Sequence, residues 1–372
     1  MSTRCAIVGA GLGGFVAYAT LRHGGLQSAE IAVFGDDPDP AGAWRVRAAA
    51  IRQQRMRSES DGHCFPTTFP GLAAREAARR RTLSPLLLSV CDRYRPTVDE
   101  FLRHVDQLRE DSRWDESLRP GRVAGVRSVG DGFELEGHGV FRHVLLAPGH
   151  PGLSVPPELE SDARVVHAYE PHDYASRVAV IGAGMAAATE WRNAVEAGAE
   201  VVSVRHREPA RRPLNVARPL FSKRGLASFH AAPRQRRAQL LRGISAPSYP
   251  PGREWDEPLE RAAREGRFKV QPALNGTALN GIGQVICATG FRRGFQHDPL
   301  LRRLVSEHDL ETEERWIVLA DDCTVPALTD AGRTLTLAGV PAQWAYPAAD
   351  TLVGMKYASR RFLQRVERCP TR

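Results

Sequence analysis

The sequence predicts an α/β fold with two parallel sheets, and three observations carry this prediction. A strand, a glycine-rich turn, a helix and a second strand follow one another in residues 4–34, and the same order returns in residues 177–207. The chain has 372 residues, which is more than one ordinary domain needs and enough for two. Hydrophobic residues make up 42% of the chain and charged residues 25%, which is the composition of a folded globular protein.

The first unit opens with a short apolar strand that leads into a GxGxxG turn, whose glycines are Gly9, Gly11 and Gly14. The first glycine permits the tight turn, the second lets the backbone approach a pyrophosphate, and the third lets the helix pack closely on the strand. We expect a helix over residues 15–22 and a returning strand over residues 31–34. The N-terminus of that helix is thereby aimed at a phosphate.

The second unit repeats this order, with a strand at residues 178–181 and a GxGxxA turn. In this turn Gly182, Gly184 and Ala187 hold the three key positions, and a helix is expected over residues 188–197. One such turn is a weak signal, but two in the same structural context predict two Rossmann-like dinucleotide-binding domains. The alternative is a pair of glycine-rich turns that bind no nucleotide.

The residue after the second strand of each unit selects the ribose, because a carboxylate there accepts from the 2′-OH and an arginine there accommodates a 2′-phosphate. In the second unit this position is Arg205, with Arg207 beyond it, which favours NADPH over NADH. Solvated surface arginines are the alternative in so arginine-rich a chain. In the first unit the position falls on Gly35, and the nearest acid, Asp36, comes one residue late.

The formal net charge of +8 does not by itself indicate a nucleic-acid partner. Only three of the 51 basic residues are lysines, a skew that coding bias explains as well as selection for charge. The basic runs 79–81 and 205–212 lie apart and lack the interleaved aromatic residues of a base-stacking groove. We therefore expect no nucleic-acid partner.

Cysteine usage and hydropathy bear on the compartment. The six cysteines stand singly, so the sequence contains no CxxC pair, and we expect a reduced, cytoplasmic protein without a metal site. Arg4 and the apolar residues after it imitate the start of a signal peptide, but glycines from Gly9 onward break that stretch. No apolar run of 18 residues occurs in the sequence, so we expect no membrane span.

Several further segments resemble, in the same order along the chain, the flavin-containing (class B) monooxygenases, which are flavoproteins with two dinucleotide-binding domains. They are Ala-Gly-Ala-Trp at 41–44, Arg-Met-Arg-Ser at 55–58 with His63 beyond, Leu-Leu-Ala-Pro-Gly-His-Pro at 145–151, His167 with Tyr169, and Ile-Cys-Ala-Thr-Gly-Phe at 286–291. The paired glycine turns and the intact Ala-Thr-Gly-Phe are the most specific part of this resemblance.

The resemblance implies an FAD-binding domain over residues 1–170 and 285–372, with an NADPH-binding domain over residues 171–284 inserted into it. The cofactors would be FAD and NADPH. The residues expected on the flavin side are Gly9, Gly11, Gly14, Asp36, Trp44, Arg57, Ser58 and Trp344. Those expected on the NADPH side are Gly182, Gly184, Ala187, Arg205, Arg207 and Thr289. His63 and His167 are the candidate polar residues near the reacting centre, and a purely structural role is the alternative for each.

The resemblance also implies a reaction, in which NADPH reduces FAD, O₂ adds at flavin C4a to give a hydroperoxide, and a small nucleophilic nitrogen or sulfur substrate takes up one oxygen. Three departures from the family pattern bear on the reaction subtype: only His167 remains of the fingerprint before the second turn, the terminal Trp-Pro of the Baeyer-Villiger version is absent, and the C-terminal Gly-Asp of many reductase relatives is missing.

Two other functions therefore stay open. One is an NADPH-dependent flavin reductase that passes electrons to a quinone, a disulfide or a protein carrier. The other is a cofactor-holding partner or sensor protein without enzymatic activity. The arginine- and proline-rich residues 209–258 read as a long excursion of the NADPH unit beside the nicotinamide or substrate entrance. A homodimer is an alternative to a monomer, because Trp255, Trp316 and Trp344 suit either a core or an interface.

Overall fold

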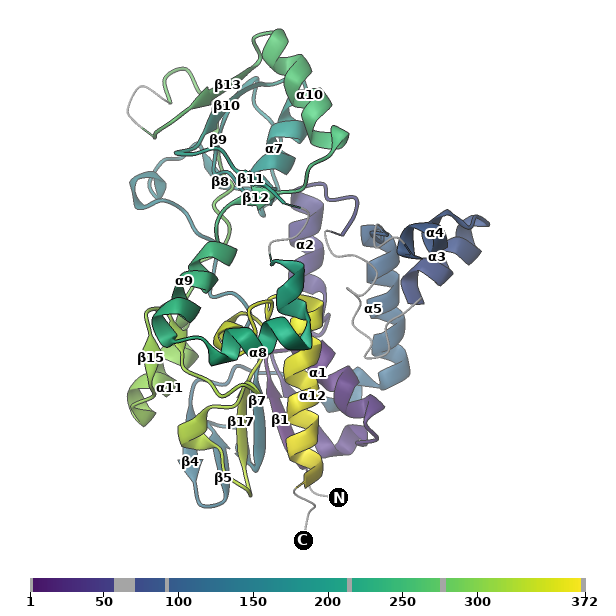
Figure 1. Cartoon of the computed structure of the whole chain (residues 1–372), viewed down its shortest axis with the longest axis vertical. Coiled ribbons are helices and arrows are strands. Elements are labelled where there is room, and N and C mark those ends of the chain that lie inside the picture. Colours follow the sequence, from purple (N-terminus) through teal and green to yellow (C-terminus); the bar gives the residue numbers. More distant parts are fainter. Residues whose placement is uncertain (1–2, 57–70, 91–93, 213–215, 275–278, 369–372) are drawn as a thin grey trace.

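The computed structural model describes residues 3–56, 71–90, 94–212, 216–274 and 279–368, and it confirms the α/β fold with two parallel sheets (Figure 1). The strands of the first sheet lie in the order β17 (Thr334–Leu337), β7 (His143–Leu146), β1 (Cys5–Val8), β2 (Ile31–Phe34) and β3 (Leu118–Arg119). Those of the second lie in the order β13 (Phe268–Gln271), β10 (Glu200–Val204), β9 (Arg177–Ile181), β14 (Gln284–Cys287) and β8 (Val165–His167). Each sheet is the core of one domain.

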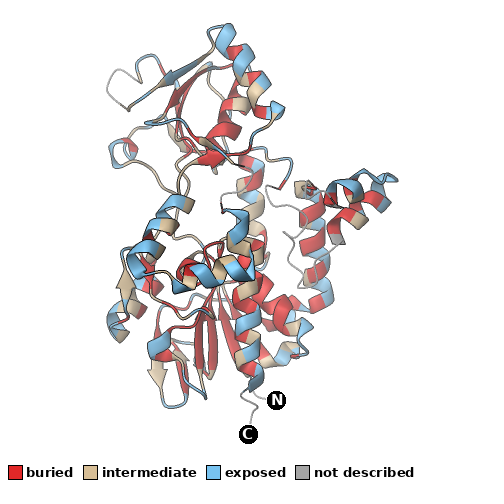
Figure 2. Cartoon of the chain, viewed as in Figure 1, coloured by how far each residue is buried: buried red, intermediate tan, exposed pale blue. Residues whose placement is uncertain are grey.

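The first sheet is buried on both faces, as Figure 2 shows in red. Every residue of β1 is buried, which suits a parallel strand with cover on either side. Helices α1 (Leu12–His23) and α12 (Leu352–Arg368) pack against each other beside this sheet. Gly24 allows their close approach, because a Cβ there would lie 2.5 Å from a methyl carbon of Leu363.

Three helices begin at residues other than those expected. The helix expected from residue 15 begins at Leu12, because Gly11 already acts as its N-cap with extended backbone (φ −77°, ψ −172°). Helix α7 (Met185–Glu196) begins three residues before the expected start for the same reason, with Gly184 as its N-cap. The C-terminal helix, which the sequence predicts to start near residue 348, begins at Leu352, because the Thr351 hydroxyl accepts from the Gly354 N–H at 3.1 Å.

The second domain holds β8, which lies before the boundary expected at residue 171. It pairs with β14 and so belongs to the second sheet by its hydrogen bonds. Helices α7 and α10 (Arg253–Arg264) pack together beside this sheet. The boundary expected at residue 285 falls within β14 of the same sheet, and the division into domains itself stays a prediction.

The excursion that leaves the second domain between the short strands β11 (Ala210–Arg211) and β12 (Ser248–Tyr249) does not stay with that domain. Its helices α8 (Lys223–Ala231) and α9 (Arg234–Ile244) lie over the first domain (Figure 1). Phe229 and Leu241 are buried in the first domain's hydrophobic core. These apolar residues of the excursion are therefore buried against the first domain and not against the second.

The remaining elements flank the two sheets. They are α2 (Gly42–Ala50), α3 (Gly71–Arg80), α4 (Ser84–Val90), α5 (Val98–Ser112), α6 (Trp114–Ser117), α11 (Pro299–His308), the antiparallel strands β4 (Val126–Val129), β5 (Gly132–Leu135) and β6 (Gly139–Phe141), and the β15 (Thr312–Glu313)–β16 (Trp316–Ile317) hairpin. Thr97 caps α5 by accepting from the Glu100 N–H at 3.2 Å. No helix in the described ranges is both long enough and apolar enough to cross a bilayer.

Candidate functional site

The first glycine turn has the steric properties that a dinucleotide requires. Gly9 has φ +112°, and a Cβ there would lie 2.2 Å from the Ala147 carbonyl oxygen. A Cβ on Gly14 would lie 1.8 Å from the Gly9 carbonyl oxygen, so helix and turn touch backbone to backbone. A Cβ on Gly11 would meet no atom within 4 Å. The protein itself therefore needs glycine at the first and third positions, whereas the second faces open space at the N-terminus of α1.

The second glycine turn repeats this geometry. Gly182 has φ +131°, and a Cβ there would lie 2.6 Å from the Ala288 carbonyl oxygen. Gly184 faces open space, with nothing within 4 Å of a Cβ. Ala187, at the third position, is fully buried, so this helix accommodates one methyl group against its strand. Both helix N-termini thus present free backbone N–H groups toward an open cradle.

The acid expected for the first ribose lies away from the strand end. A Cβ on Gly35 would lie 2.5 Å from the Ala10 Cβ, so the strand end is pressed against the glycine turn and no side chain fits there. Asp36 is displaced outward and is 56% exposed. Its carboxylate accepts from Arg122 Nε at 2.7 Å. Its assignment to the ribose stays a prediction.

Arg205 lies at the end of β10, where the sequence places it. Its backbone N–H donates to the Gln271 carbonyl at 2.9 Å, and its guanidinium lies 4.9 Å from the centre of the Trp191 ring. One guanidinium nitrogen contacts Glu208 at 2.8 Å, while Nε has no partner among the described residues. The side chain is 9% exposed and therefore held in one place, unlike the exposed Arg207.

Two segments cross between the domains side by side. Leu153 and Phe291 form an antiparallel bridge, and the Ser154 N–H donates to the Gly290 carbonyl at 2.9 Å. Thr289, expected on the NADPH side, donates its hydroxyl to the Ser154 carbonyl. In the structure Thr289 therefore fastens one crossing segment to the other.

Three aromatic rings stack on one another beside the two crossing segments. His150 lies 4.0 Å from Phe291, and Phe291 lies 5.1 Å from Tyr169, between ring centroids, with both pairs stacked. The Arg47 guanidinium, from α2, lies 4.9 Å from the Phe291 ring centre. Burial, together with Arg293 and Arg47 nearby, lowers the pKa of His150 to about 3, so this imidazole is neutral at ordinary pH.

His167, a candidate catalytic residue, lies buried beside this stack at the end of β8. Its Nε2 lies 3.0 Å from the Gly290 carbonyl, and its Nδ1 accepts from the Tyr169 N–H at 3.1 Å. This pairing fixes the Nε2–H tautomer. Burial lowers the pKa of His167, which agrees with a neutral ring. Both ring nitrogens of His167 are hydrogen-bonded to main-chain groups, so the ring connects the end of β8 to the crossing segment at Gly290. Its catalytic role stays a prediction.

The other residues expected near the flavin are spread out. Trp44 packs edge-to-face on Phe101, with ring centroids 5.1 Å apart, and Trp344 is buried beside Trp316. Arg57, Ser58 and His63 lie outside the described residues.

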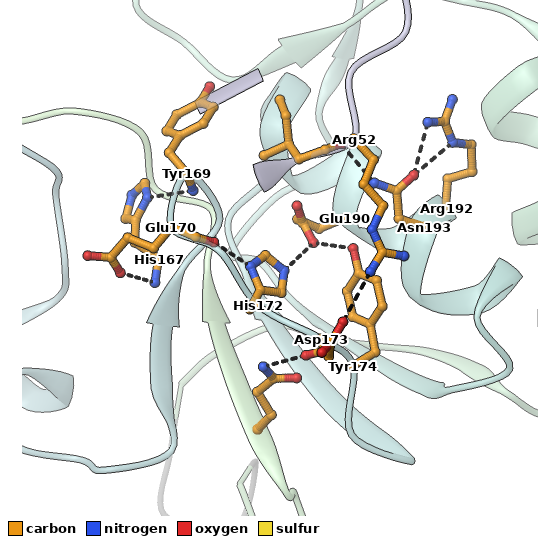
Figure 3. Close-up of polar contacts among 12 residues, drawn as sticks. Arg52, His167, Tyr169, Glu170, His172, Asp173, Tyr174, Glu190, Arg192 and Asn193 are labelled. Carbon is orange, nitrogen blue, oxygen red and sulfur yellow. Dashed lines mark hydrogen bonds and ion pairs between the residues drawn. The ribbon is translucent and has the colours of Figure 1, made fainter. Parts of the chain in front are cut away.

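The end of α2 joins the first domain to the second, as Figure 3 shows. The Ile51 carbonyl accepts from Asn193 Nδ2 at 2.9 Å, and the Ile51 side chain is buried in the second domain's core. The Arg52 guanidinium lies 4.9 Å from the Tyr174 ring centre and 3.6 Å from the Asp173 carboxylate. This junction is a third connection between the domains, beside the two crossing segments.

Below this junction a buried carboxylate holds the segment that enters the second domain (Figure 3). Glu190, fully buried on α7, accepts from the Tyr174 hydroxyl at 2.8 Å and from His172 Nε2 at 3.1 Å. The His172 Nδ1 lies 2.7 Å from the Glu170 carbonyl. Burial lowers the pKa of His172, but the hydrogen bonds to Glu190 and to this carbonyl outweigh burial and leave the pKa raised. Both ring nitrogens face acceptors, an arrangement that favours the imidazolium form of His172.

The excursion fastens onto the C-terminal segment of the first domain. His230 Nε2 contacts the Ala345 carbonyl at 2.6 Å, and the Arg237 guanidinium lies 5.7 Å from the Trp344 ring centre. Residues 209–258 therefore cover the segment near Trp344 that is expected beside the flavin. Sequence reasoning missed these contacts, as it missed Arg47 and Glu190, because nothing local marks them. His150 belongs to the Leu-Leu-Ala-Pro-Gly-His-Pro segment at 145–151, but its contact with Phe291 is known only from the folded structure.

No family model matches the chain, and no curated protein matches it. Solved structures do. An ornithine hydroxylase from Pseudomonas aeruginosa is 16% identical with a TM-score of 0.70, covering 98% of this chain and 100% of its own. The ornithine N-hydroxylase of Kutzneria sp. 744, solved with reduced FAD, NADP⁺ and L-ornithine, is 14% identical with a TM-score of 0.75, covering 99% of each chain.

The bacillithiol disulfide reductase of Bacillus cereus is also similar, with 14% identity and a TM-score of 0.60, and the match covers 98% of this chain and 99% of that one. These matches confirm the predicted fold of two Rossmann-like dinucleotide-binding domains. Hydroxylases and reductases share it, so the fold alone does not separate the two activities.

Proposed function

We propose that this chain is an FAD- and NADPH-dependent monooxygenase that transfers oxygen to a nucleophilic nitrogen or sulfur of a small substrate. The observation that carries the proposal is the pair of glycine cradles, open at Gly11 and Gly184 and joined by one crossing. At both positions the protein's own packing leaves room for a side chain, which agrees with a backbone that a pyrophosphate approaches closely. The likeness to ornithine hydroxylases along nearly the whole chain supports the same proposal.

The bound flavin would supply the oxygen chemistry, passing one atom of O₂ to the substrate and the other to water at the expense of NADPH. The chain's own part is to bind, orient and exclude water. Gly9, Gly11 and Gly14 would hold FAD, and Gly182, Gly184 and Arg205 would hold NADPH. The excursion helices and the buried Trp344 segment would keep water from the reacting centre.

The first test is spectroscopic. Purified protein should be yellow, and its flavin absorbance should be bleached under anaerobic conditions faster by NADPH than by NADH. After oxygen is admitted with a panel of small primary amines and thioethers, one hydroxylamine or S-oxide should form per NADPH in the coupled reaction. A colourless protein that takes up no FAD contradicts the proposal.

A flavin reductase is the second candidate, because the disulfide reductase shares the fold. Against a dithiol mechanism, the described cysteines Cys5, Cys287 and Cys323 are buried. Burial raises the pKa of Cys5 to about 12 and that of Cys287 to about 11, so neither thiol is reactive. Turnover that needs an added quinone, disulfide or carrier protein and yields no oxygenated product would favour the reductase.

Arg205→Gln tests the choice of nicotinamide cofactor. A charge-assisted contact to the 2′-phosphate contributes about 1.5–3 kcal/mol, so kcat/KM for NADPH should fall about tenfold to a hundredfold. The value for NADH should change by less than about twofold, because NADH lacks that phosphate. Arg264→Gln is the matched control, since this arginine is exposed on α10 and has no assigned contact with a cofactor. An equal loss with both cofactors would show that Arg205 serves only to pack on Trp191.

The partners under this proposal are a small-molecule substrate and O₂, without nucleic acid or membrane. The cytoplasmic location and the oligomeric state, with a homodimer as one alternative, stay predictions.

A further inference from the structure

A pocket lies beside the crossing between the domains. Neither glycine turn lines it. Gly149 and Pro151 come from the first crossing segment, Arg293 and Phe295 follow the second, and Gln343 lies beyond β17. The pocket therefore belongs to neither pyrophosphate cradle, and its lining comes from the first domain and the first crossing segment.

One part of the pocket wall is apolar. It consists of Phe295, Leu301, Trp316, Ile317, Val340 and Pro341. Leu301, Trp316 and Ile317 are also part of the first domain's core, so their positions are set by packing. Such a wall favours a ligand with a hydrocarbon or aromatic body.

The other part of the wall carries two arginines that share one neutral partner. Arg293 Nη1 donates to the Ser245 hydroxyl at 2.8 Å, and Arg315 Nη2 donates to the same oxygen at 3.1 Å. Ser245 follows helix α9, so two guanidinium groups from the first domain contact the same residue of the excursion. Arg315 is oriented further by Trp316, whose ring centre lies 4.7 Å from its guanidinium.

The nearby acids Glu314 and Asp298 form their hydrogen bonds and ion pairs with groups other than this arginine pair. In the described part of the chain, neither arginine forms an ion pair with a carboxylate. Glu314 pairs with Arg242 instead. Asp298, which also lines the pocket, caps α11 by accepting from the Leu301 N–H at 3.0 Å. Burial, and after it the charge of Arg293, lowers the pKa of Arg315, as expected where positive charges crowd.

We propose that Arg293 and Arg315 bind the carboxylate of an organic acid whose apolar body lies against Phe295 and Trp316. Two half-buried cations with a neutral bridging hydroxyl gain charge-assisted hydrogen bonds from an anion, and the planar carboxylate matches the guanidinium fork. Resting on the proposed function, this makes the oxygenated substrate an acid with a sizeable hydrophobic part.

The test is isothermal titration of the purified yellow protein with phenylacetate, with the neutral phenylacetamide as a matched probe. Phenylacetate should bind at least about tenfold more tightly than phenylacetamide. Arg293→Gln and Arg315→Gln should each weaken phenylacetate binding about tenfold or more and leave phenylacetamide unchanged. Arg242→Gln is the control, because this neighbouring arginine has Glu314 as its partner and should change neither value.

Two further arms identify the source of the anion. Inorganic phosphate and NADP⁺ are titrated in competition with phenylacetate. If either displaces it and the arginine variants lose affinity for NADP⁺ instead, the pair binds a cofactor phosphate and the proposal is overturned. Equal binding of phenylacetate and phenylacetamide would overturn it as well. Titration does not require turnover, so absence of binding in protein that NADPH still reduces would refute the acid site alone, whereas protein without flavin would refute the proposed function.

Discussion

Gly14→Ala is expected to abolish flavin binding and to destabilise the first domain by about 3 kcal/mol or more. The added Cβ would lie 1.8 Å from the Gly9 carbonyl oxygen, which is backbone and has no side chain that can rotate away. Relief requires that α1 move off β1, which would displace the helix N-terminus from the phosphate position. Soluble yield, bound flavin per chain and the unfolding midpoint in denaturant measure this outcome.

Two matched variants of the same turn separate packing from ligand contact. Gly11→Ala should fold with an unchanged unfolding midpoint, because nothing lies within 4 Å of its Cβ. It should nevertheless bind FAD about a hundredfold more weakly, since the methyl group occupies the approach of the pyrophosphate. Gly13→Ala should keep the flavin, because its Cβ would lie 3.5 Å from the Ala147 Cβ, which is ordinary contact. Wild-type flavin affinity in Gly11→Ala would show that this cradle does not hold the pyrophosphate.

His172→Ala is the second substitution for which a large effect is expected. It leaves Glu190, which is fully buried, without its cationic partner, and such a loss costs about 3–5 kcal/mol. Tyr174→Phe is the control: it removes one hydrogen bond to the same carboxylate and should cost only about 1 kcal/mol. Denaturant unfolding followed by circular dichroism and by tryptophan fluorescence measures both losses of stability.

The pH dependence of this pair has a definite sign. The folded-state pKa of His172 is raised above its ordinary value of about 6.5, so the folded protein binds the proton more tightly than the unfolded chain. The stabilisation is fully present below about pH 6.5 and is lost as the pH rises through the raised pKa. Unfolding free energies measured from pH 5.5 upward should show this decline in the wild type and lack it in His172→Ala. Parallel curves would refute the assignment of the titration to His172.

The same pair bears on the position of the second domain, because the segment it holds also carries Tyr174 and Asp173, the partners of Arg52 at the end of α2. Its disruption should slow flavin reduction by NADPH more than it weakens NADPH binding, since the substitution lies in the segment that enters the second domain and not in the turn at Gly184. Rapid-reaction reduction over a range of NADPH concentrations separates the two quantities.

The two cradles were predictable from sequence because their chemistry is local. A glycine with positive φ, a glycine without neighbours and a buried third position follow one another within six residues at Gly9–Gly14, and the strand and helix on either side have regular periods. The sequence also predicts the second strand of each unit and the arginine at the end of β10.

Other features of the site depend on contacts between residues that are far apart in the sequence. Asp36 comes late because Gly35 lies against Ala10, and that contact exists only once β2 stands beside the turn. His167, chosen as a polar residue near the centre, is occupied at both nitrogens by main-chain groups, one of them 123 residues away. Residues 209–258 read as part of the second domain, yet their helices complete the core of the first.

By itself the sequence determined the α/β class, the two glycine cradles and the cation at the end of β10, because each is written in neighbouring residues and in strand and helix periodicity. Only the tertiary structure decided where the excursion packs, how α2 joins the second domain, and that Arg293 and Arg315 meet at Ser245. These features arise when side chains far apart in the sequence are buried against one another or bring their charges together. No local sequence pattern specifies which distant surfaces will exclude water from one another.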